Sequence, residues 1–125
     1  MKVTYGEILE AKTALEILAK KELKTAEAIG LARLIKALNS ELEVFFQKQQ
    51  EHCEKYGEFD EKSGSFKPFE ESREQFLEKH AELLGTAFDA DITRAEIHSD
   101  IAVEAATVLG TEKFVEWGRE EQNDD

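Results

Sequence analysis

The 125-residue sequence has one cysteine, one proline and one tryptophan, and it lacks any apolar run near the ~20 residues of a membrane span. The lone Cys53 excludes an internal disulfide and leaves too few thiolates for a structural zinc site. The first residues also lack the apolar core of a signal peptide. We therefore expect a globular, cytoplasmic chain with no membrane contact, in which a single proline permits long helices.

Signals of catalysis and cofactor binding are also missing. None of the histidines His52, His80 and His98 has the preceding glutamate of a carboxylate-bridged metal centre, and there is no glycine-rich phosphate loop. Adjacent helical residues point about 100° apart, so Cys53 and His52 do not form a catalytic pair, and glutamates near Cys53 raise its thiol pKa. His80 fits a hydrogen-bonded structural histidine. We expect no catalytic, cofactor-binding or metal-binding residues, and hence no enzyme.

Charge is concentrated in one half of the chain. Residues 1–56 carry nine basic and nine acidic side chains, whereas residues 57–125 carry seven basic and nineteen acidic ones, which accounts for the net charge of −12. This balance disfavours direct binding to nucleic acid, because such affinity comes from cationic side chains. It leaves two alternatives, a solvated surface or an acidic face for a basic partner. The candidate acidic face consists of Glu70, Glu71, Glu74, Glu78, Asp89 and Asp91.

The N-terminal half predicts two helices. Thr4 and Glu7 form a capping-box pattern before a helix over about residues 5–20, and a turn follows over residues 22–24. Thr25 is the candidate N-cap of a second helix of about thirty residues, which Gly57 ends as a left-handed C-cap. Apolar residues recur along this helix in heptad steps. They are Ala28, Leu31, Ile35, Leu38, Leu42 and Phe45.

The second half predicts a small hairpin and further helices. Phe59 and Phe66 flank a polar loop, which favours a β-hairpin with the two rings on one face and packed against the helices. Pro68 opens a third helical pattern that stops at residue 85. A short extended piece is expected over residues 87–92 and a helix over about residues 100–109. Thr111 then caps a last helical segment bearing Phe114, Val115 and Trp117.

The expected fold is therefore mainly α with a minor β component. It comprises a helical hairpin with one long helix, a small β-hairpin, a third helix and short C-terminal helices. We expect a single domain over residues 1–118 and a disordered acidic tail over residues 119–125.

The distal part of the long helix is a candidate contact surface. Beyond Phe46 polar residues occupy the seam positions, so this end of the helix should be exposed to solvent or contact a polar partner. We expect a partner protein to contact Phe46, Gln49, Tyr56, Phe59 and Phe66. The first helix is too short to cover the whole seam, which leaves two alternatives. Either the third helix with Phe114 and Trp117 covers the rest and the chain is a monomer, or the chain forms an antiparallel homodimer through the long helix near Leu42 and Phe45, which we favour.

The order of elements resembles a known family. In this chain a helical hairpin leads through EKYGEFDEKSGSFKP and FLEKHAELLGTAFDADI to an extended piece that ends in Asp-Ile. This pattern, over about residues 1–92, resembles a family of small phage and prophage proteins of Gram-positive bacteria. The resemblance implies a phage or prophage origin and action in the infected bacterial cytoplasm or in the virion. It supplies neither an enzymatic role nor functional residues.

Two functional hypotheses follow, with a weaker third. The first is a non-enzymatic phage accessory protein that acts by protein–protein contact. The second is an inhibitor of a host defence nuclease, which would use the acidic half as a nucleic-acid mimic in the manner of some anti-CRISPR proteins. The third is an enzyme with a carboxylate site built from Glu70, Glu71, Glu74 and Glu78, although these side chains more simply solvate the outer face of a helix.

Overall fold

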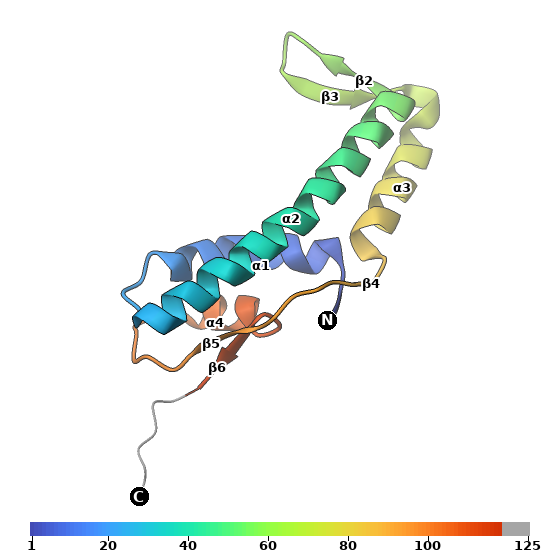
Figure 1. Cartoon of the computed structure of the whole chain (residues 1–125). Coiled ribbons are helices and arrows are strands. Elements are labelled where there is room, and N and C mark those ends of the chain that lie inside the picture. The colour runs from blue at the N-terminus through green and yellow to red at the C-terminus, as the bar shows by residue number, and fades with distance from the viewer. Residues whose placement is uncertain (119–125) are drawn as a thin grey trace, which may run out of the picture.

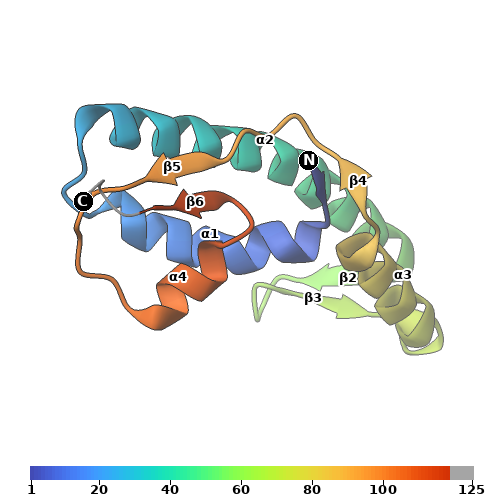
Figure 2. The same ribbon diagram turned by 90° about the horizontal axis from the view of Figure 1, so that it is seen from below.

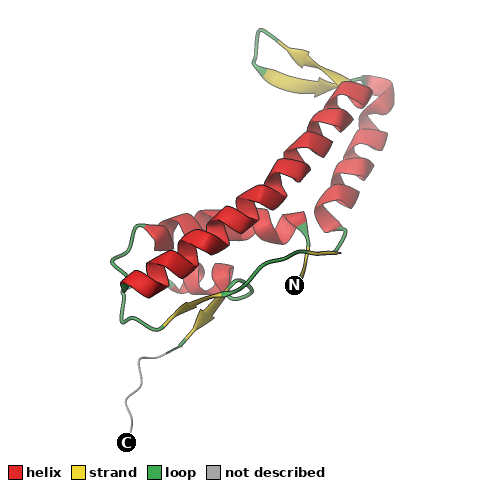
Figure 3. Cartoon of the chain, in the orientation of Figure 1, coloured by secondary structure: helices red, strands yellow, loops and turns green. Residues whose placement is uncertain are grey.

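A single long helix, α2 (Thr25–Tyr56), connects the two parts of the computed structural model, which describes residues 1–118 (Figure 1). The fold is mainly helical with short strand pairs, which confirms the expected class (Figure 3). The other elements are β1 (Lys2–Val3), α1 (Tyr5–Ala19), β2 (Gly57–Asp60), β3 (Ser65–Pro68), the 3₁₀ turn η1 (Glu70–Ser72), α3 (Arg73–Gly85), β4 (Phe88–Asp89), β5 (Ala95–Ile97), α4 (Ala105–Thr111) and β6 (Val115–Trp117).

Residues 25–45 of α2 belong to a proximal core, and the last third of the helix, residues 46–56, belongs with β2, β3 and α3 to a distal arm. In the proximal core α2 contacts both α1 and β5, β6 pairs with β5, and α4 packs on α1 (Figure 2). Most of the fully buried apolar side chains lie here. They include Ile8, Leu15, Leu18, Leu31, Leu34, Ile97, Phe114 and Val115.

The capping box of α1 is confirmed. The Glu7 amide donates to Thr4 Oγ1 at 3.1 Å, and the Thr4 amide donates to Glu7 Oε1 at 2.9 Å. Two of the amides that the first turn leaves without helical partners are therefore satisfied. The prediction for α2 was less accurate, because Lys24 occupies the N-cap position and Thr25 is already the first helical residue.

The heptad seam of α2 faces the interior, with a shift at its start. Leu31, Leu38, Leu42 and Phe45 are buried as expected. Ala28 is exposed, however, and Leu34, which we had not included, is 2% exposed. Ile35 is only half-buried. The reason is that β5 and α1 flank this helix together and widen its buried stripe beyond a two-helix seam.

The β-hairpin has the expected register, in which Phe59 pairs with Phe66. Gly64 has φ of 72° in the turn, where glycine avoids a steric cost. The prediction of a left-handed cap at Gly57 was wrong, because its φ is −172° and it begins β2. A Cβ at Gly57 would clash with the Lys67 carbonyl oxygen, so the glycine is required by close packing.

The third helix starts later than predicted. Pro68 is the last residue of β3, a strand end at which proline is tolerated, and η1 precedes the start of α3 at Arg73. The Phe69 amide donates to the Tyr56 carbonyl oxygen at 2.8 Å, which ties the end of the hairpin to the end of α2. None of the α3 side chains is fully buried.

The segment after α3 contains more strand than the sequence predicted. The extended piece is present as β4, which pairs antiparallel with β1. The helix predicted over residues 100–109 instead spans Ala105–Thr111. The predicted last helix is wrong, because Val115–Trp117 forms β6 and pairs in parallel with β5. The predicted tail, residues 119–125, lies outside the described residues.

Candidate functional site

A groove of about 690 Å³ lies where the hairpin leaves the end of α2. We call it the aromatic groove. Phe46, Gln49 and Cys53 line it from α2, and Phe59 and Phe66 line it from β2 and β3. The structure thus brings together four of the five side chains that we predicted to bind a partner. The remaining lining residues are Gln50, Glu54, Gly57 and Glu58.

Local geometry explains why these side chains converge. Phe46, Gln49 and Cys53 are three and four residues apart, so they share one face of the helix. Phe66 is fixed by Phe76 of α3, with the ring centroids 4.7 Å apart. Among residues 1–118 Phe59 makes no such ring contact with a helix, and it is 64% exposed, so only one of the two hairpin rings packs as expected. Phe46 is also 47% exposed. Two large aromatic side chains therefore remain open to solvent at one groove.

Tyr56 is the predicted partner-binding residue that the groove does not contain. It is 9% exposed, its carbonyl oxygen is bonded by Phe69, and its ring lies 6.4 Å from that of His52. Gln49 and Tyr56 are seven residues apart and nearly in line along the helix. The packing of α3 beside the last turn of α2 nevertheless covers Tyr56 and leaves Gln49 on the groove side.

The chemistry of the aromatic groove combines apolar surface with negative charge. Glu54 and Glu58 line it, and no Lys or Arg among the described residues does so. Burial raises the pKa of the Cys53 thiol, and the nearby Glu54 raises it further, in the direction expected from the sequence. A thiol with a raised pKa stays protonated at neutral pH and is a poor nucleophile. The groove is therefore better suited to contact than to covalent chemistry.

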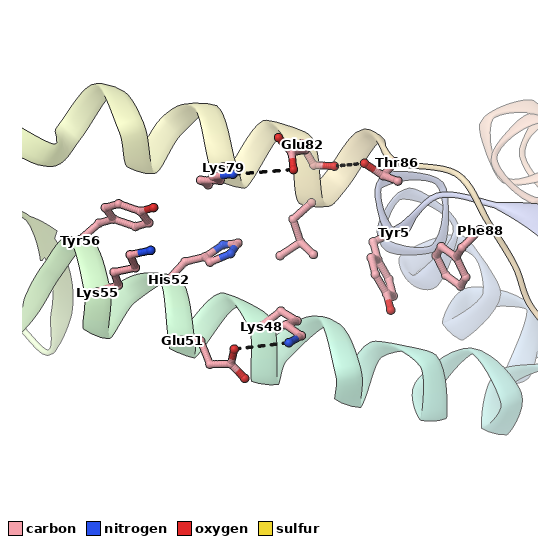
Figure 4. A pocket seen from close by; sticks show the side chains of 11 residues that line it. Tyr5, Lys48, Glu51, His52, Lys55, Tyr56, Lys79, Glu82, Thr86 and Phe88 are labelled. Atoms are coloured by element: carbon pink, nitrogen blue, oxygen red, sulfur yellow. Dashed lines mark hydrogen bonds and ion pairs between the residues drawn. The ribbon is translucent and has the colours of Figure 1, made fainter.

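A second cavity of about 670 Å³ lies between α2 and α3 (Figure 4). We call it the interhelical cavity. Lys48, His52 and Lys55 of α2 line it, and their spacing places them on the face opposite the aromatic groove. His52 and Cys53 therefore face different sides of the helix, as expected. The sequence contains a signal for this cavity, because Lys48, His52 and Lys55 recur at helical spacing. From the sequence alone we interpret them only as part of the polar end of the seam.

The remaining candidate residues do not form a compact site. The six residues of the candidate acidic face are all exposed, and they follow the chain from η1 along α3 to just beyond β4. Within residues 1–118, no three His, Cys, Asp or Glu side chains are grouped so that they could hold a metal ion. His80 stacks on Phe76, but its buried Nδ1 has no hydrogen-bond partner among the described residues, so the expected hydrogen bond is absent.

No described helix is both long enough and apolar enough to span a membrane. The comparisons with known proteins leave the family of the chain open. No protein family, no curated protein and no solved structure gave a significant match to this sequence or fold.

Proposed function

We propose that this chain is a non-enzymatic phage or prophage accessory protein that binds another protein through the aromatic groove. The observation that carries the proposal is the exposure of Phe46 and Phe59, at 47% and 64%, on two elements that meet at one groove. Aromatic side chains are enriched at protein interfaces, and they dominate binding energies there. The resemblance to phage and prophage proteins supports action in the bacterial host cytoplasm during infection or lysogeny, or in the virion.

The charges of the groove define the kind of partner. Glu54 and Glu58 line it without a neighbouring cation from the described chain, so they favour a partner with lysine or arginine beside its apolar contact residues. The partner should insert an apolar side chain between Phe46 and Phe59. Contact through these two rings requires no change in the core, because both already lie at the surface.

The experiment compares three purified variants as bait in lysates of phage-infected bacteria. Phe59→Ala and Phe46→Ala remove the groove rings, and Leu109→Ala removes an equally exposed apolar residue, 66% exposed, from α4 in the proximal core. A protein captured by the wild type is then purified, and its dissociation constant is measured. We expect each groove substitution to weaken binding by roughly 30-fold, the effect of a binding hot spot, and Leu109→Ala to leave it unchanged. Equal binding by all variants would exclude the groove.

The charge distribution favours a second candidate function. The six exposed carboxylates follow η1, α3 and β4, of which α3 alone is on the order of 20 Å long, and the second half of the chain holds the whole charge deficit. An inhibitor of a host defence nuclease could present this surface to a cationic nucleic-acid channel. Inhibition should then weaken steeply as the salt concentration rises from roughly 50 to 300 mM, because interactions between exposed charges are screened beyond ~10 Å at 0.1 M. A panel of RNA-guided and restriction nucleases of the host that keep full activity would exclude this candidate.

A further inference from the structure

The interhelical cavity has a different chemistry at each end. Tyr5 and Phe88 close one end, with their ring centroids 4.6 Å apart, and Leu83 also lines the cavity. Lys55 and Tyr56 lie toward the other end, and His52 extends between the two helices (Figure 4). A volume of about 670 Å³ is within the usual range of small-molecule sites. The shape therefore suits a small ligand with an apolar body and a polar end.

The balance of charge in this cavity differs from that of the whole chain. Three lysines and two glutamates line it, although the protein as a whole carries a net charge of −12. Lys48 is paired with Glu51 at 3.4 Å, and Lys79 lies 4.0 Å from Glu82.

Lys55 is the cation left over. In the described part of the chain it has no carboxylate partner, and its Nζ lies 5.3 Å from the centroid of the Tyr56 ring. A ligand that brings a negative charge would supply the missing partner to Lys55, and Lys79 and His52 lie within the same cavity.

We propose that the interhelical cavity binds a small aromatic carboxylate. Its ring would lie against Tyr5 and Phe88, where offset aromatic contacts are favourable, and its carboxylate would accept hydrogen bonds from Lys55. A neutral analogue loses the charge-assisted interaction and retains only the apolar contact. This inference is independent of the aromatic groove, because the two sites lie on opposite faces of α2.

The test uses 4-phenylbutyrate and its neutral amide, 4-phenylbutyramide, as matched probes. Binding is followed by the NMR signals of the His52 ring during titration of the full chain. We expect saturable shifts with the carboxylate and at least roughly tenfold weaker binding of the amide. Lys55→Ala should weaken binding of the carboxylate by about tenfold, whereas Lys62→Ala, in the exposed hairpin turn, should leave it unchanged.

Three outcomes would overturn the proposal. They are the absence of saturable shifts at millimolar carboxylate, equal binding of acid and amide, and equal binding by the Lys55→Ala variant. Because Lys55 is exposed, its replacement should preserve the fold, which a thermal unfolding curve verifies. Phe59→Ala serves as a separate control, since a loss of probe binding in that variant would place the probe in the aromatic groove.

Discussion

Lys113 donates to both carboxylate oxygens of Glu7, each 2.8 Å from its Nζ, and so ties the chain just before β6 to the first turn of α1. This interaction lowers the pKa of Glu7 most, and the hydrogen bonds with Thr4 lower it further, against the opposing effect of burial. Both side chains are about two-fifths exposed, at 39% and 41%. The pair is therefore expected to affect the titration of Glu7 more than the stability of the protein.

Replacing Lys113 by methionine should make this difference measurable. Lys113→Met keeps much of the apolar stem but removes the charge, so the pKa of Glu7 should rise toward its ordinary value. The free energy of unfolding should fall by no more than about 1 kcal/mol, because exposed ion pairs contribute little. NMR titration of the Glu7 carboxyl carbon and urea unfolding measure the two quantities. An unchanged Glu7 titration would show that Lys113 does not bind Glu7 in solution.

Glu27 should make the stability of the protein depend on pH. Burial acts to raise the pKa of this carboxyl, but hydrogen bonds from the Ser99 hydroxyl and from the amides of His98, Lys24 and Ser99 outweigh it and lower the pKa. A lowered pKa means that the stabilisation is complete above the ordinary value of 4.5 and is lost as the pH falls through the lower folded-state value.

The variant Glu27→Gln should lose stability at pH 7 by about 1 to 3 kcal/mol, since charge-assisted hydrogen bonds are replaced by neutral ones. Below the folded-state pKa of Glu27 the variant and the wild type should converge. Urea unfolding at pH 7 and at successively lower pH provides the comparison, with the exposed Glu16→Gln as the control. A difference between wild type and variant that does not shrink as the pH falls would contradict the assignment.

Two glycines should respond to alanine in opposite directions. At Gly57 a new Cβ would lie 2.5 Å from the Phe66 ring, so Gly57→Ala should force the hairpin away from α2 and cost about 1 to 3 kcal/mol. Gly30 lies inside α2 with nothing within 4 Å of its Cβ position, so Gly30→Ala should stabilise the protein by about 0.5 to 1 kcal/mol. Thermal unfolding of both variants tests the pair, and destabilisation by Gly30→Ala would be inconsistent with the helix packing described above.

Self-association through α2 stays a prediction, but its interface cannot be centred on Leu42 and Phe45. Leu42 and Phe45 are each 2% exposed and are covered by the chain itself, so their replacement would damage the core. Val44 and Phe46, which are 45% and 47% exposed, are the nearest large apolar side chains that α2 leaves open, and they lie on either side of the buried Phe45 because residues two apart on a helix do not share a face. Burial of such side chains in a dimer stabilises it by about 1.5 to 3 kcal/mol each.

Light scattering at micromolar concentration should therefore give the mass of two chains. The double variant Val44→Glu/Phe46→Glu should give the mass of one, and Leu109→Glu in α4 should leave the dimer intact. A wild-type mass of one chain would rule out the dimer at that concentration.

The parts of the fold that were predictable from the sequence depend on signals within one element. The Thr4–Glu7 capping box involves residues three apart, and the pairing of Phe59 with Phe66 follows from a short polar loop. The seam from Leu31 to Phe45 repeats over four turns, so a single shifted position such as Leu34 does not alter the assignment of the helix. Each of these signals is complete before any distant contact forms.

The parts that were not predictable depend on distant partners. Val115–Trp117 has an aromatic and β-branched composition that also fits the end of a helix, and only its parallel pairing with β5 makes it a strand. Within the candidate site, Phe46, Phe59 and Phe66 could be predicted because these aromatic side chains flank the polar end of the seam in the sequence. Tyr56 was misplaced because helical spacing alone does not reveal that α3 covers the last turn of α2.

The pairing of β1 with β4 and of β5 with β6 also affects the order in which the chain can fold during its synthesis. In the distal arm, β2 pairs with β3 and α2 packs on α3, so its contacts join segments that leave the ribosome in succession. The proximal core instead needs Val3 to meet Phe88 and Ala95 to meet Val115. Until residues 95–117 have emerged, α2 lacks its β5 neighbour. The side of α2 that contacts β5 therefore stays uncovered until those residues have been synthesised, so we expect the distal arm to form before the proximal core is complete.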